Sequence, residues 1–273
     1  GLNYLINEQP DKAVDVFIKL LEVNNDTVET HLALGSLFRR RGEVDRAIRI
    51  HQNLIARPQM SEQQRTEALM ALGRDYMSAG VFDRAERVFL EVVSNDSDYT
   101  HLSLNCLLDI YQQEKSWQKA IDTLQQLASV TGEKKNNIIA HLYCEMAEEA
   151  IRNQRFDLAH QSLKKAIKTD RNSVRTSLLL GRLACDESRY YAAIEAYQNV
   201  KLQNPDFLSE AIPALVYCYE QLGEEQACLD YLFATLNEYP RISVVSVLAD
   251  KIKDSQSVES AIEFFSEQLD KSP

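Results

Sequence analysis

Residues 73–89 read GRDYMSAGVFDRAERVF, and this stretch decides the fold. Gly73 and Tyr76 are three residues apart, Gly80 follows, and Ala85 and Phe89 are four residues apart. Residues at these spacings share one face of a helix, so the stretch predicts two helices joined by a glycine turn. Helix backbones approach closely only where their side chains are small, so we expect Gly73 and Ala85 at the crossing of the two helices.

The same pattern recurs along the whole chain. The alanines equivalent to Ala85 follow one another at intervals of 34, 38, 35, 39, 34, 34 and 34 residues: Ala13, Ala47, Ala85, Ala120, Ala159, Ala193, Ala227 and Ala261. Twelve residues before each alanine stands a crossing residue, small in six of eight cases: Gly1, Gly35, Gly73, Leu108, Ala147, Gly181, Leu215 and Ala249. Four residues after each alanine stands a bulky residue, here called the knob: Phe17, His51, Phe89, Leu124, Leu163, Tyr197, Tyr231 and Phe265. This spacing is the pattern of the tetratricopeptide repeat.

The repeat predicts an all-α protein, a right-handed superhelix of about eight helix pairs in a single array. One pair cannot bury its apolar face alone, so successive pairs must stack. The predicted units span residues 1–27, 28–61, 66–99, 101–134, 140–173, 174–207, 208–241 and 242–273. Two spacings are long. Ser61 and Gln64 form a capping-box pattern that predicts a longer helix after the first insertion, and residues 132–137 are expected to form a charged loop. Eight glycines and six prolines in 273 residues are too few for a β-sandwich or barrel.

The composition also excludes several functions. A net charge of −11 argues against nucleic-acid binding, which needs clustered Lys and Arg. All eight glycines are needed for crossings, turns or the loop, so none is left for a phosphate-binding site, and no catalytic motif is present. We therefore expect a chain that is not an enzyme and binds no cofactor. The five cysteines are odd in number and contain no C-x-x-C pair, which predicts reduced thiols without metal or disulfide. We also expect a soluble chain, cut from a longer protein, because no apolar run reaches membrane-spanning length and Gly1 falls inside a predicted helix.

In such an array the first helix of each pair lines a concave groove. With the crossing residue as position 8, the groove positions of the first helix are 2, 5, 9, 12 and 13. The candidate partner-binding residues occupy these positions: Arg39, Arg40, Met70, Arg74, Met77, Asn105, Asp109, Gln112, Arg175 and Arg182. Arginines next to methionines favour a site for an extended or helical peptide that carries carboxylates. We expect Arg39 and Arg74 to point away from the stacked core. The alternative is an ordinary solvated helix face with incidental arginines.

Several stretches resemble one family beyond the general repeat: residues 42–52, 73–77, 82–86, 117–122, 140–145 and 168–173. They are similar to lipopolysaccharide assembly protein B of Gram-negative bacteria, and the resemblance runs along essentially the whole chain. The runs at 42–52 and 73–77 are the most specific, because they match at variable surface positions as well as at the repeat skeleton.

The resemblance implies a function that the repeat alone does not. Members of that family have an N-terminal membrane helix, a cytoplasmic repeat region and a C-terminal rubredoxin-like ribbon that binds a metal through two C-x-x-C pairs. The chain contains the repeat region but neither of the other two parts. The family restrains lipopolysaccharide synthesis as an adaptor at the cytoplasmic side of the inner membrane. It brings the deacetylase committed to lipid A synthesis to a membrane-bound AAA protease, and the resemblance also allows for a homodimer. The alternative is a general repeat scaffold of another bacterial assembly, such as one in division or secretion.

Overall fold

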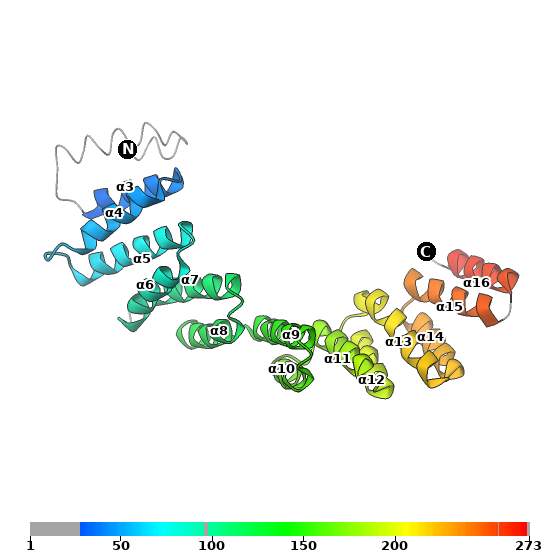
Figure 1. Ribbon diagram of the computed structural model, residues 1–273. Helices are drawn as coiled ribbons and strands as arrows, with labels where there is room; N and C mark the ends of the chain where they lie inside the picture. Colours follow the sequence, from blue (N-terminus) through cyan, green and yellow to red (C-terminus); the bar gives the residue numbers. More distant parts are fainter. Residues whose placement is uncertain (1–27, 96–97, 256, 272–273) are drawn as a thin grey trace. The chain divides into compact units, whose positions relative to one another are not determined.

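The computed structural model describes residues 28–95, 98–255 and 257–271, and all regular elements in these ranges are helices (Figure 1). The elements are α3 (Val28–Arg40), α4 (Val44–Ile55), α5 (Glu62–Ser78), α6 (Phe82–Ser94), α7 (Thr100–Gln113), α8 (Trp117–Thr131), α9 (Asn136–Arg152), α10 (Phe156–Thr169), α11 (Val174–Asp186), α12 (Tyr190–Gln203), the 3-10 helix η1 (Pro205–Phe207), α13 (Leu208–Leu222), α14 (Glu225–Glu238), α15 (Ile242–Ser255) and α16 (Val258–Lys271). The predicted all-α class is confirmed. The first predicted unit, residues 1–27, lies outside the described residues.

Consecutive helices form pairs, and the pairs follow one another in chain order. The chain folds as two compact units, residues 1–135 and residues 136–273. In the first unit, α3 packs on α4, α5 on α6 and α7 on α8, and the first helices also contact one another, α3 with α5 and α5 with α7. In the second unit the same arrangement joins α9 to α11, α11 to α13 and α13 to α15. Each described part is therefore a stack of helix pairs, as the repeat predicts.

The three described crossings that carry glycine have the predicted geometry. A Cβ atom added to Gly35 would lie 2.4 Å from His51, one added to Gly73 would lie 2.6 Å from Phe89, and one added to Gly181 would lie 2.5 Å from Tyr197. The knob of the second helix therefore fills the space that the missing side chain of the first helix leaves open. Because real Cβ atoms hardly ever come this close to other atoms, a larger residue at any of these three crossings would force the ring of the knob to shift.

The predicted alanine is buried in α4, α6, α8, α10, α12 and α16, where it is a sensitive position for stability. In α14 the predicted register is wrong by one residue, because Ala227 is exposed and Cys228 and Leu232 are buried instead.

Ala47, Ala85 and Ala193 have no exposed surface, so each Ala→Leu substitution should destabilise the fold by about 1–3 kcal/mol through overpacking. Ala192, exposed beside Ala193 in α12, provides the control Ala192→Leu. The measurement is urea denaturation followed by circular dichroism. Equal stability of the Ala192→Leu and Ala193→Leu proteins would contradict the assigned register.

The turns between paired helices need a left-handed residue. Gly42, Gly80 and Gly223 supply it with φ angles of 80°, 71° and 70°, and their helix-ending role agrees with the sequence. The equivalent turns between α7 and α8, between α9 and α10, and between α11 and α12 use non-glycine residues with φ of 56°: Lys115, Gln154 and Ser188. A left-handed residue thus recurs at this turn in the six described pairs that show it, and glycine supplies it in only half of them.

The two long spacings have a common structural result. Ser61 and Gln64 form the predicted capping box, and α5 has 17 residues, which confirms the lengthened helix. The second insertion was expected to be a loop through residue 137, but α9 begins at Asn136 and also has 17 residues. Only residues 132–135 lie outside helices there. The reason is that an exposed first turn needs no apolar side chains, so the polar Asn136 and Asn137 can begin the helix.

None of the described helices is both long enough and apolar enough to cross a membrane.

Candidate functional site

The groove positions differ in exposure. Six of the ten candidate residues are exposed: Arg40, Arg74, Asn105, Asp109, Gln112 and Arg182. Three are partly buried: Arg39, Met77 and Arg175. Met70 is buried, with only 3% of its surface accessible. The helical periodicity therefore selected a surface that is partly open and partly covered by the next helix pair.

Met70 does not belong to an open surface, and its assignment as a partner-binding residue is wrong. Ser103 on α7 donates a hydrogen bond to the Met70 sulfur at 2.8 Å. The same relation recurs in the second unit, where the Cys144 sulfur on α9 lies 3.3 Å from the Thr176 hydroxyl on α11. In both cases position 5 of one pair meets position 3 of the next pair. Position 5 is therefore part of the packing between repeats in these pairs.

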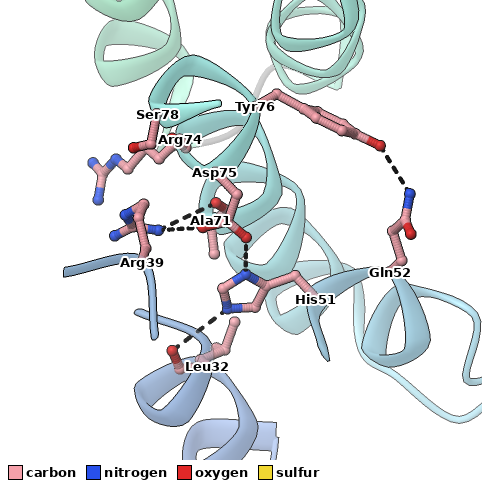
Figure 2. A network of polar contacts seen from close by, with 9 residues as sticks. All are labelled: Leu32, Arg39, His51, Gln52, Ala71, Arg74, Asp75, Tyr76 and Ser78. Atoms are coloured by element: carbon pink, nitrogen blue, oxygen red, sulfur yellow. Dashed lines mark hydrogen bonds and ion pairs between the residues drawn. The ribbon is translucent and has the colours of Figure 1, made fainter. Parts of the chain in front are cut away.

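Arg39 is held in a buried polar network that joins three helices (Figure 2). Its guanidinium lies 2.7 Å from one carboxylate oxygen of Asp75, and the other oxygen lies 2.5 Å from the Nδ1 atom of His51. Asp75 and His51 are fully buried, whereas the Arg39 side chain keeps 17% of its surface exposed. Arg39 also contacts the carbonyl oxygen of Ala71 at 3.4 Å. The network thus connects α3, α4 and α5.

The network changes the interpretation of Arg39. Its charge compensates a carboxylate that has left water, and an isolated buried carboxylate is costly. The expectation that Arg39 points away from the stacked core is therefore wrong, and the arginine is a structural residue at a repeat junction. Asp75 was absent from the candidate residues. The sequence does contain a pattern that could have indicated this network. Asp75 is an acidic residue next to Tyr76 in an otherwise apolar stripe, and the preceding pair contains an arginine and a histidine.

Arg175 is likewise engaged within the protein. Its guanidinium nitrogens lie 2.8 Å from Glu145 and 2.9 Å from Glu148 on α9, and it also contacts the ring of His141. Burial and, after it, the Arg175 charge lower the pKa of His141, which favours its neutral form. Glu145 lies outside the groove positions and was not predicted. The cluster ties α9 to α11.

The exposed candidates of the first unit define a surface, here called the α3–α7 patch. It consists of Arg40 on α3, Arg74 on α5, and Asn105, Asp109 and Gln112 on α7. Figure 2 shows Arg74 and Arg39 projecting on the same side of α5. The pKa of the Cys106 thiol is raised, mainly by burial. The charge of Arg74 acts in the opposite direction, and the charge of Asp109 adds to the increase in pKa. Arg74 and Asp109 therefore act on a common point between α5 and α7. Exposed guanidinium and carboxamide groups suit recognition of carboxylates and peptide backbone.

Within the described residues, no three His, Cys, Asp or Glu side chains are close enough together to hold a metal ion. The predicted absence of a metal in this chain stays a prediction.

Comparison with known proteins supports the repeat assignment. Family models described as tetratricopeptide repeat match residues 30–63 and residues 144–205. The C-terminal part of a tetratricopeptide repeat-containing protein from Cytophaga hutchinsonii is a structural neighbour with a TM-score of 0.52 and 15% identity. The match covers 89% of this chain and 96% of that one, and at this identity it shows the fold alone. The chain is thus a helical-repeat solenoid of a type that mediates protein–protein interaction.

Curated relatives show the family. Lipopolysaccharide assembly protein B of Escherichia coli strain K12 is 40% identical over 273 residues, which cover 100% of this chain and 70% of that protein. The protein of the same name from Haemophilus influenzae strain Rd is 35% identical over 282 residues, with the same coverage of 100% and 70%. Repeat arrays of this kind are scaffolds, and the chain is not an enzyme. Its similarity to these relatives extends over every residue, and the chain belongs to the lipopolysaccharide assembly protein B family.

Proposed function

We propose that the chain is an adaptor that regulates lipopolysaccharide synthesis by bringing the deacetylase committed to lipid A synthesis to a membrane-bound AAA protease. The observation that carries this proposal is 40% identity to the family over the full chain. The tetratricopeptide repeats support it, because stacked helix pairs offer long surfaces for protein partners. The protein would act at the cytoplasmic side of the inner membrane, and this chain would need no metal or cofactor of its own.

The α3–α7 patch is the surface we propose for a protein partner. It offers two exposed arginines, and a guanidinium binds a carboxylate through two parallel hydrogen bonds that a lysine cannot reproduce. Asn105 and Gln112 can donate to and accept from a peptide backbone. An acidic peptide, extended or helical, fits this set of donors. Arg182 on α11 is a further exposed arginine in the second unit.

The double substitution Arg40→Ala with Arg74→Ala should weaken partner binding by at least about tenfold, which equals roughly 1.4 kcal/mol. Both side chains are exposed, so the helical content should stay unchanged. Binding of the purified deacetylase and of the purified protease would be measured by biolayer interferometry at two salt concentrations. The matched control is Arg87→Ala, since Arg87 is exposed on α6, the second helix of its pair.

Two results would contradict this proposal at different levels. An equal loss of affinity in the Arg87→Ala protein would place the partner outside the α3–α7 patch but leave the adaptor function standing. Binding of neither purified protein by the unmodified chain would contradict the adaptor function, and partners in division or secretion would then be sought. Sedimentation of the free chain would show in the same samples whether it forms the homodimer that the family resemblance suggests.

A further inference from the structure

Two cysteine thiols meet at the junction between two repeats of the second unit. Cys185 lies near the C-terminal end of α11, and Cys218 lies in α13, the first helix of the next pair. Their sulfur atoms are 3.1 Å apart. The sulfurs of a disulfide are about 2.0 Å apart, so a displacement of about 1 Å would join them. The two cysteines are 33 residues apart in the sequence, and repeat stacking brings them together.

The two thiols differ in accessibility. Cys218 is fully buried, whereas Cys185 is partly exposed and occupies a groove position. Burial and, after it, the neighbouring Cys185 thiol raise the pKa of Cys218 to about 12. A soluble oxidant therefore reaches Cys185 first, and Cys218 lies directly behind it as the second thiol. This is the arrangement of a reactive cysteine next to a resolving cysteine.

We propose that Cys185 and Cys218 form a reversible redox pair that closes into an intramolecular disulfide when the protein meets a peroxide. In the first step the Cys185 thiolate attacks one oxygen of the peroxide, the O–O bond breaks, and Cys185 becomes a sulfenic acid while hydroxide leaves. In the second step the Cys218 sulfur attacks the Cys185 sulfur and the sulfenic oxygen leaves as water, taking the Cys218 proton. The sum is two thiols and one hydrogen peroxide giving one disulfide and two waters, with two electrons passing from the sulfurs to the peroxide.

The disulfide would link α11 covalently to α13. These helices belong to successive pairs, and Cys185 is three residues from the exposed Arg182. A cross-link here removes the freedom of the two pairs to separate, because it closes the segment between them. The expectation that the five cysteines form no disulfide then holds for the reduced protein only. This inference does not depend on the adaptor function.

The test uses the 273-residue chain, hydrogen peroxide and mass spectrometry. The protein is oxidised briefly, denatured without reductant, treated with N-ethylmaleimide and analysed intact and as peptides. We expect three alkylated cysteines instead of five, and a linked peptide pair that contains Cys185 and Cys218 with a mass lower by two hydrogens. Dithiothreitol should restore alkylation of both residues.

Single substitutions complete the design. Cys218→Ala should leave Cys185 as a sulfenic acid that dimedone traps, while Cys185→Ala should abolish the linked peptide. Cys228→Ala is the matched control, because Cys228 is a buried thiol elsewhere in the same unit, and its loss should leave the bridge unaffected. The proposal is overturned if Cys218 remains alkylated after Cys185 has been oxidised, or if the bridge joins two chains. A linked peptide from another cysteine pair would overturn it equally.

Discussion

Replacement of Arg39 by alanine should destabilise the helices around it by about 3 kcal/mol, the lower end of the range for breaking a buried ion pair. Among the contacts drawn in Figure 2, the fully buried Asp75 carboxylate has two side-chain partners, Arg39 and His51. Without Arg39 it would keep the His51 ring alone. The lower end applies because 17% of the Arg39 side chain is exposed and water can enter when it is removed.

Hydrogen exchange measured by mass spectrometry would localise this effect. Amides of α3, α4 and α5 should lose protection, while those of α11 to α16 should not change, since each repeat contacts only its neighbours. Arg40→Ala, one residue along and exposed, is the control and should leave protection unchanged. Addition of Asp75→Asn to the Arg39→Ala protein should recover part of the loss, because it removes the uncompensated charge. No recovery would mean that the buried charge is not the cause.

Replacement of Phe89 by alanine should cost about 3–5 kcal/mol, the range for removing an aromatic ring from a core. The Phe89 ring is fully buried in α6 and covers the backbone of α5 at Gly73. Its loss removes apolar contacts and leaves a cavity between two helices whose crossing is fixed by that ring. The measurement is urea denaturation, with Leu90→Ala as control because the Leu90 side chain is 46% exposed in the same helix.

A second change would show whether the cost comes from the helix crossing. Gly73→Ala alone should destabilise the protein, because the added Cβ would lie 2.6 Å from the Phe89 ring. In the Phe89→Ala background the same Cβ enters the empty space, so Gly73→Ala should be neutral or stabilising there. If Gly73→Ala costs the same in both backgrounds, the two residues are not in contact and the assigned crossing is wrong.

The crossings could be predicted from the sequence because they depend on a short, repeated spacing. Gly73, Ala85 and Phe89 lie within one helix pair, where helical periodicity and one short turn fix all three positions. The turn at Gly80 was predictable for the same reason. Local geometry is enough at these crossings, but it placed Ala227 in the core of α14, where the structure exposes Ala227 and buries Cys228.

The candidate site was predictable only in part because it depends on stacking between pairs. Periodicity identifies the face of α5 that carries Met70 and Arg74, but not which part of that face the next pair covers. Ser103 on α7 covers Met70, and Arg74 stays exposed one turn further along. The pairing of Arg39 with Asp75 spans 36 residues and likewise follows from the stacking. The tight approach of Cys185 to Cys218 could not be read from their spacing either.

The contact between a crossing glycine and its knob also restricts the order in which mutations can be accepted during evolution. Where a ring fills the space beside the glycine, as at Gly35, Gly73 and Gly181, a side chain added first would collide with it. Loss of the ring first leaves a cavity that neighbouring side chains can partly close. In the fifth pair the crossing residue is Ala147 and the knob is Leu163, both fully buried. This pair has a side chain at the crossing and no ring at the knob, which is the result expected after both changes. Substitutions at the two positions are therefore epistatic. A residue that is accepted in one repeat can prevent folding when it stands at the same position of another repeat.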